Sequence, residues 1–158
     1  MKDIFKLIIS IVGCQLVGLA GTVFTVNSIP TWYMTLNKPP FSPPNWIFGP
    51  VWTLLYLMMG ISFYLIWKQG WQSDSSKTAR KYFLAQLALN FIWTPIFFGL
   101  KSPLIALVVI ITMWVMILVT IKKFYPLSKW SAYLLIPYLL WVSFATLLNA
   151  AIVVLNLK

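Results

Sequence analysis

Side chains that could perform acid–base, nucleophilic or metal chemistry are scarce in this sequence. It contains no His, one Cys (Cys14) and two carboxylates (Asp3 and Asp74), and both carboxylates lie in charged flanking segments. An intrachain disulfide, a His/Cys metal site, a Ser-His-Asp triad and a paired-carboxylate site are therefore excluded. The protein must work without the usual catalytic side chains, and we expect no required cofactor.

Aromatic and amide residues recur along single faces of three apolar segments. Residues four apart share a helix face, so Gln86 and Asn90 lie on one face, which continues through Trp93 and Phe97. Two further stripes are formed by Gly49, Trp52, Tyr56 and Gly60 or Phe63, and by Pro137, Trp141, Ala145 and Asn149. Such stripes are typical either of helix-packing seams, with amides bonded across helices, or of a cavity with flat aromatic walls for a planar apolar ligand.

The helices that carry these stripes are expected to cross a membrane. Of the 158 residues, 61% are hydrophobic and 9% are charged, whereas soluble domains are about 25% charged. A spanning helix needs roughly 20 apolar residues. We therefore predict an all-α membrane protein, a five-transmembrane-helix bundle that forms one domain over residues 1–158. Its spans are expected at about 5–26, 46–67, 82–100, 103–121 and 130–155.

The first span has an alternative interpretation. The residues before Cys14 resemble a lipoprotein cleavage site, but the apolar stretch continues well past Cys14, which favours a retained helix. Small residues in this span allow another helix to approach closely; they are Gly13, Gly18, Ala20 and Gly21.

The longest loop, residues 27–45, is predicted to fold back over the membrane surface as a lid. Four prolines within residues 39–44 forbid a regular helix and favour stiff, extended backbone. Its Trp32, Tyr33 and Phe41 would be costly to leave in water. We call this segment the lid loop.

Basic residues lie in the gaps between the apolar runs. This placement indicates that they set the orientation of the helices in the membrane and contact the lipid bilayer, rather than bind nucleic acid. Nine of the 12 Lys/Arg residues flank one side of the membrane, and the other three are Lys38, Lys101 and Lys158. The positive-inside rule then places the N-terminus in the cytoplasm and the lid loop and C-terminus outside. Tryptophans at span ends are expected to anchor the interfaces; they are Trp46, Trp67, Trp71 and Trp130.

Several motifs agree in order and spacing with one known family. They are WYMTLNKPPFSPPNW at 32–46, GPVWTLLYLMMG at 49–60, QLALNFIW at 86–93, FFG at 97–99, PYLLW at 137–141 and ATLLN at 145–149. Over about residues 13–155 the chain resembles the TspO/MBR family of tryptophan-rich sensory or translocator proteins.

The resemblance implies a five-helix bundle, commonly a homodimer, that binds porphyrins and other planar apolar ligands under the lid loop. The family's pocket positions fall on Trp52, Tyr56, Asn90, Phe97, Trp141 and Ala145, with Trp32 and Pro43 in the loop above. We add Trp93 and Asn149 from the stripes as candidate ligand-binding residues. In this interpretation Trp52 and Trp141 stack on the ligand, Asn90 gives it a hydrogen bond and Ala145 leaves it room.

Two departures from the family bear on function. The C-terminal stretch 148–154 has no Tyr, so the cholesterol motif of some relatives is missing and sterol recognition is doubtful. Phe41 replaces a Trp that many relatives carry. We favour a porphyrin-binding receptor, sensor or carrier; a light-dependent porphyrin-degrading enzyme and a membrane transporter or scaffold remain alternatives. A proton-coupled pump is disfavoured because no carboxylate lies within an expected span.

Overall fold

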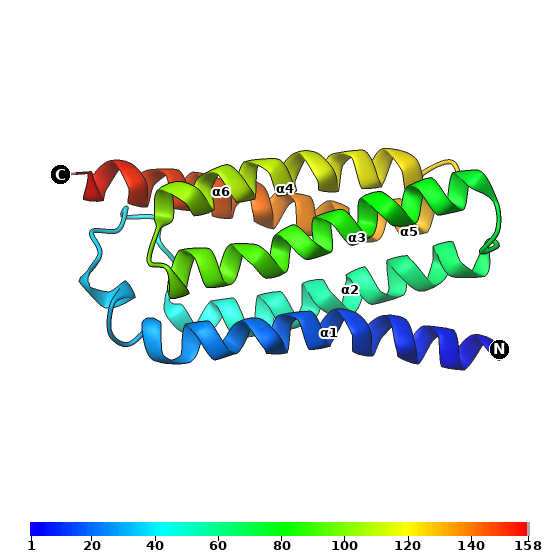
Figure 1. Cartoon of the computed structure of the whole chain (residues 1–158), viewed down its shortest axis with the longest axis horizontal. Helices are drawn as coiled ribbons and strands as arrows, with labels where there is room; N and C mark the ends of the chain where they lie inside the picture. The colour runs from blue at the N-terminus through cyan, green and yellow to red at the C-terminus, as the bar shows by residue number, and fades with distance from the viewer. Residues whose placement is uncertain (158) are drawn as a thin grey trace.

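The computed structural model describes residues 1–157 and contains five helical segments long and apolar enough to cross a membrane (Figure 1). No β-strand occurs within these residues, so the predicted five-helix bundle is confirmed. The α-helices are α1 (Asp3–Ser28), α2 (Phe48–Lys68), α3 (Asp74–Thr94), α4 (Pro103–Phe124), α5 (Lys129–Leu134) and α6 (Ile136–Asn156). Shorter turns of helix lie at Tyr33–Thr35, Asn45–Ile47 and Pro95–Gly99.

The third span begins earlier than predicted, at Asp74 rather than near residue 82. Its N-cap is Ser73, whose hydroxyl accepts a hydrogen bond from the Ser76 backbone N–H, and Asp74 lies in the first turn. Both features favour a helix start. Hydropathy does not detect the polar start of this helix, residues 74–81, because it reports only the apolar segment and not the helix that extends beyond it.

Two prolines within the predicted spans coincide with breaks in the helices. Pro95 ends α3, and residues Pro95–Gly99 form a wider π-type turn, in which the Leu100 N–H bonds the Pro95 carbonyl at 2.8 Å. The last span is divided into α5 and α6 at Leu135. Pro137 has no N–H to continue the ladder, and its ring disfavours straight helix one turn before it.

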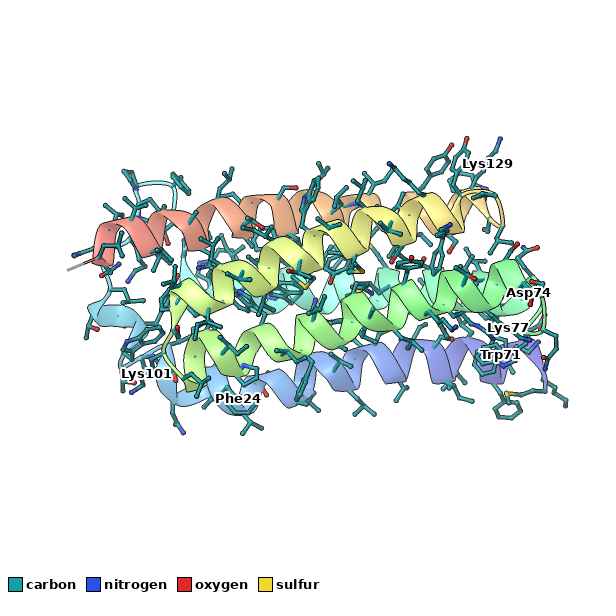
Figure 2. All side chains as sticks on the ribbon, turned by 45° about the horizontal axis from the view of Figure 1, so that its top comes forward. Phe24, Trp71, Asp74, Lys77, Lys101 and Lys129 are labelled. Carbon is teal, nitrogen blue, oxygen red and sulfur yellow. The ribbon has the colours of Figure 1, made fainter. Side chains whose placement is uncertain are left out.

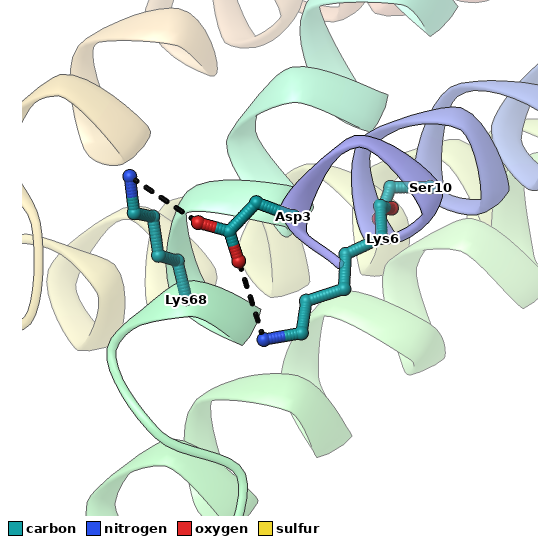
Figure 3. Close-up of polar contacts among 4 residues, drawn as sticks. All are labelled: Asp3, Lys6, Ser10 and Lys68. Carbon is teal, nitrogen blue, oxygen red and sulfur yellow. Dashed lines mark hydrogen bonds and ion pairs between the residues drawn. The ribbon is translucent and has the colours of Figure 1, made fainter. Parts of the chain in front are cut away.

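The helices run side by side, with the N-terminus and the C-terminus at opposite ends of the bundle (Figure 1). The charged residues divide between the same two ends: Asp74, Lys77 and Lys129 lie at one end and Lys101 at the other (Figure 2). At the first of these ends Asp3 pairs with Lys6 at 3.6 Å and with Lys68 at 3.7 Å, which joins the start of α1 to the end of α2 (Figure 3). Asp3 and Lys68 are exposed and Lys6 is partly exposed, so each pair contributes about 0–1 kcal/mol.

Close helix contacts depend on small residues, as expected for helices in lipid. A Cβ at Gly60 of α2 would lie 2.6 Å from the Ile11 Cα of α1, so glycine is required for this backbone approach. Further along α2, the buried hydroxyls of Ser62 and Ser131 each bond the other residue's carbonyl, at 2.8 and 2.7 Å. These exchanged bonds join α2 to α5.

The lid loop folds back onto the end of the bundle. Tyr33 is buried, and its ring packs against Phe97 and Phe98. The Asn156 side chain of α6 accepts from the Asn37 N–H at 3.0 Å and donates to the Asn37 carbonyl at 2.9 Å. These two hydrogen bonds join the lid loop at Asn37 to the last turn of α6.

Candidate functional site

A cavity of about 370 Å³ lies inside the half of the bundle that the lid loop covers. All five long helices contribute to its wall, and among the described residues no charged side chain lines it. Its volume falls within the range of about 300–1,000 Å³ that small-molecule sites occupy. A neutral, mainly apolar wall of this kind is suited to holding an apolar ligand rather than to hydrolysis or proton transfer.

Most of the residues predicted from the sequence meet at this cavity. Those that line it are Trp52, Tyr56, Asn90, Trp93, Phe97, Trp141, Ala145 and Asn149. Trp32 and Pro43 do not line it. The Trp32 ring packs edge-on against Phe97, with centroids 5.7 Å apart, so it supports the wall from outside. Pro43 is half-buried within the lid loop.

Aromatic rings hold one another in place around the cavity. Trp52 lies 5.6 Å from Tyr56 and 6.2 Å from Tyr138, measured between ring centroids. In the third span, Trp93 stacks on Phe97, four residues further along the chain, with ring centroids 4.9 Å apart. These separations are those of favourable aromatic pairs, each worth about 0.5–1.5 kcal/mol beyond area burial. The wall is therefore preorganised rather than loose.

Asn90 is the centre of a buried hydrogen-bond chain that joins three helices. Its Oδ1 accepts from the Tyr56 hydroxyl at 2.6 Å, and its Nδ2 donates to the Tyr138 hydroxyl at 2.7 Å. The Tyr138 hydroxyl in turn donates to Gln86 Oε1 at 2.8 Å. The amide is thus largely occupied by protein partners, so its main observed role is to position Tyr56 and Tyr138.

Asn149 makes a second contact between helices at the cavity wall. Its Oδ1 accepts from the Trp93 indole N–H at 3.1 Å, and its Nδ2 donates to the Pro103 carbonyl at 2.8 Å. The Pro103 carbonyl lies at the first turn of α4. Asn149 therefore fixes the Trp93 ring and joins α6 to both α3 and α4.

Trp141 differs from the other polar residues of the wall. Its indole Nε1 is buried and has no hydrogen-bond partner among the described residues. Buried tryptophans usually find a partner for this N–H, and an unmet buried donor costs about 1–3 kcal/mol. Its ring is held at 6.1 Å from Phe48 and 5.4 Å from Phe144. Trp141 is thus a fixed aromatic wall with a free donor.

The sequence-based prediction missed the side of the cavity formed by α1. Gln15, Gly18, Gly21 and Thr22 all line it, although the small residues among them were interpreted as helix contacts alone. Gly18 lines the cavity and also allows a close helix contact, since a Cβ there would overlap the Tyr56 ring. No stripe of aromatics or amides marks α1, so the sequence carried no signal beyond the glycines.

Two aromatic residues near the lid loop were also not predicted as part of the wall. Phe48 and Tyr33 line the cavity, and both lie within or beside the loop motif quoted above. Burial raises the pKa of the Tyr33 phenol above its usual range, so the ring stays neutral at physiological pH. The wall keeps its uncharged character at this end too.

Comparison with known proteins gives a consistent result. Residues 10–155 match the sequence model of the TspO/MBR family. Tryptophan-rich protein TspO of Archaeoglobus fulgidus is 47% identical over 98% of this chain and 99% of its own. Tryptophan-rich sensory protein of Cereibacter sphaeroides is 40% identical over 79% of this chain and 77% of its own. Human translocator protein is 41% identical over 75% of this chain and 70% of its own.

Proposed function

Because this chain belongs to the TspO/MBR family, we propose that it is a membrane receptor or sensor whose cavity binds a planar apolar ligand of the porphyrin class. The names of its relatives, a sensory protein and a translocator protein, support a role in sensing or moving a small molecule. The resemblance of the loop and helix motifs to the family supports the ligand class.

The observation that carries the proposal is the aromatic cavity itself. Trp52, Trp93, Phe97 and Trp141 come from three different helical segments and line one uncharged space of about 370 Å³. Flat rings held by neighbouring rings offer stacking surfaces to a flat ligand, and little of their side-chain entropy remains to be lost on binding. An apolar ligand would also find no buried charge to desolvate.

The buried indole N–H of Trp141 is the candidate for one directional contact with a ligand, which would have to displace the atoms that now cover it. Since its Nε1 has no partner within the described residues, a ligand acceptor placed there would satisfy a donor that is otherwise stranded. The sequence has no His, the commonest axial ligand of haem iron. We therefore propose a metal-free porphyrin with the Trp141 N–H directed to one of its polar groups.

A visible-absorption titration of the purified protein with protoporphyrin IX tests this proposal. Trp141→Ala should weaken binding by about 1–3 kcal/mol, the range measured for base–aromatic stacking, or about five- to 150-fold in Kd. Trp141→Phe keeps a ring but removes the N–H, so it should lose a smaller part of that affinity. Trp130→Ala is the matched control, because Trp130 is 74% exposed and lines no part of the cavity.

Three results would contradict the proposal. One is a wild-type protein whose spectrum does not saturate with porphyrin. Another is equal loss of affinity in Trp141→Ala and Trp130→Ala, which would indicate general misfolding. The last is unchanged affinity in Trp141→Ala, which would remove the cavity as the binding site.

A further inference from the structure

The cavity reaches the outer face of the bundle along the seam between α1 and α2. Leu19 and Thr22 of α1 line the cavity, as do Gly49 and Thr53 of α2, and all four are exposed. Leu19 in particular is 65% exposed although it forms part of the wall. Residues that both line the cavity and are exposed lie at its rim, which also includes Asn45 and Phe91.

The seam is open because α1 changes partners along its length. Its first half packs on α2, with Ile11 against Gly60 and Gly18 against Tyr56. Its second half packs on α3 and the turn that follows: Gly21 faces Thr94, and the Phe24 ring (labelled in Figure 2) would lie 3.2 Å from a Cβ at Gly99.

The α2 side of the seam is correspondingly empty. A Cβ added at Gly49 would meet nothing within 4 Å. Beyond Gly18 the close contacts of α1 are with Thr94 and Gly99, so the gap beside α2 begins where the two helices separate.

The side chains that border the seam do not bridge it. The Thr22 hydroxyl donates to the Leu19 carbonyl at 2.6 Å, and the Thr53 hydroxyl donates to the Gly49 carbonyl at 2.8 Å, each within its own helix. One exposed hydrogen bond crosses the seam, from Gln15 Nε2 to the Thr53 carbonyl at 2.9 Å. The border is thus small, uncharged and satisfied without a ligand.

The lid loop is held to the bundle by several contacts, although its last residue, Asn45, is exposed and also lines the cavity. Asn156 bonds both the N–H and the carbonyl of Asn37, and Tyr33 is 4% exposed. Phe41 packs on Phe144 of α6, with ring centroids 6.2 Å apart. To enter from water at this end, a ligand would have to break these contacts, whereas the hydrogen bond across the α1–α2 seam, from Gln15 to Thr53, is exposed.

The open seam faces lipid. Helix α1 has 26 residues, or about 39 Å, against about 30 Å for the hydrocarbon layer. Thr22 precedes the end of α1 at Ser28 by about 9 Å of helix, which places it inside the edge of that layer. An apolar planar molecule accumulates there, because transfer from water into lipid is favourable.

We propose that ligands enter and leave the cavity sideways from the bilayer, through the seam between α1 and α2 bordered by Leu19, Thr22, Gly49 and Thr53. This inference rests on the proposed function, since it concerns the ligand of the same cavity. It assigns the four border residues a role in the rate of binding, and it assigns the lid loop the role of a fixed cover.

Binding kinetics in lipid nanodiscs test the route, with protoporphyrin IX as probe and quenching of tryptophan fluorescence as readout. Thr22→Phe should slow both association and dissociation by about tenfold, the effect of a barrier raised by about 1.4 kcal/mol, so that Kd changes far less than either rate. Val23→Phe is the matched control: Val23 is the next residue of α1, is exposed and lines no cavity. It should leave both rates unchanged.

Two further variants complete the test. Gly49→Leu narrows the seam from the α2 side and should also slow association and dissociation. The same result in two variants would show that the effect does not come from misfolding of Thr22→Phe. Asn156→Ala releases the lid loop from α6 and should leave the rates unchanged. The entry route would be overturned if association and dissociation became faster in Asn156→Ala while Thr22→Phe and Gly49→Leu bound at wild-type rates. The proposed function would then still stand. Failure of the wild-type protein to bind at equilibrium would overturn both.

Discussion

Replacing Tyr56 by Phe and Asn90 by Leu, singly and together, tests whether the buried chain of hydrogen bonds acts as a unit. Tyr56 and Asn90 are buried on different helices, and their side chains are joined by a bond of 2.6 Å. Asn90→Leu leaves the Tyr56 hydroxyl buried without its acceptor, which costs about 1–3 kcal/mol. It also removes the donor to Tyr138, although Tyr138 keeps Gln86 as a partner.

The double variant should be more stable than the sum of the single losses predicts. Tyr56→Phe alone leaves the Asn90 carbonyl oxygen without the Tyr56 donor, and the second substitution removes that stranded group. A net hydrogen bond is worth about 0.5–1.5 kcal/mol, and comparable cycles within membranes average about 0.6 and reach about 1.7 kcal/mol. We therefore expect a coupling energy of about 0.6–1.5 kcal/mol between the two positions.

The measurement is a double-mutant cycle of unfolding free energies in mixed detergent micelles, titrated with SDS and followed by the helical circular dichroism signal. Tyr125→Phe combined with Asn90→Leu is the control pair. Tyr125 follows α4 at the opposite end of the bundle and is exposed, so its effect should be additive within about 0.5 kcal/mol. Additivity in the Tyr56–Asn90 pair as well would refute the view that Asn90 acts by positioning Tyr56.

Two further outcomes are expected. Gly60→Leu should lower the unfolding free energy by about 1–3 kcal/mol through overpacking against Ile11. Gly13→Leu is the control: a Cβ there meets nothing within 4 Å, so the unfolding free energy should change by less than about 0.5 kcal/mol. Equal losses in the two variants would contradict the close contact between Gly60 and Ile11. From the nine-to-three division of the 12 basic residues, a reporter enzyme active only outside the cytoplasm should be active when fused after Lys158 and silent within residues 72–76, and the reverse pattern would invert the orientation.

The sequence by itself determined the number of spanning segments and eight residues of the cavity wall, which lie on the second, third and last of these segments. Runs of apolar residues have no alternative in lipid but helix, because every backbone N–H and carbonyl must be satisfied internally. Pro95 and Pro137 explain the breaks in the third and last spans, because proline cannot continue a hydrogen-bond ladder. The Trp52 and Trp141 stripes followed from the helical period alone. These features depend on local rules that a single chain segment obeys wherever it lies.

Tertiary structure decided how those faces are used. The sequence suggested that Asn90 would bond a ligand, but only the approach of Tyr56 and Tyr138 from other helices shows that its amide is occupied by protein. The same holds for α1, whose plain apolar sequence gave no reason to expect a cavity wall or an open seam. The physical reason is that a hydrogen-bond partner and a gap between helices are both properties of two segments at once. Their relative placement arises from packing summed over the whole bundle, which no periodicity within one helix can report.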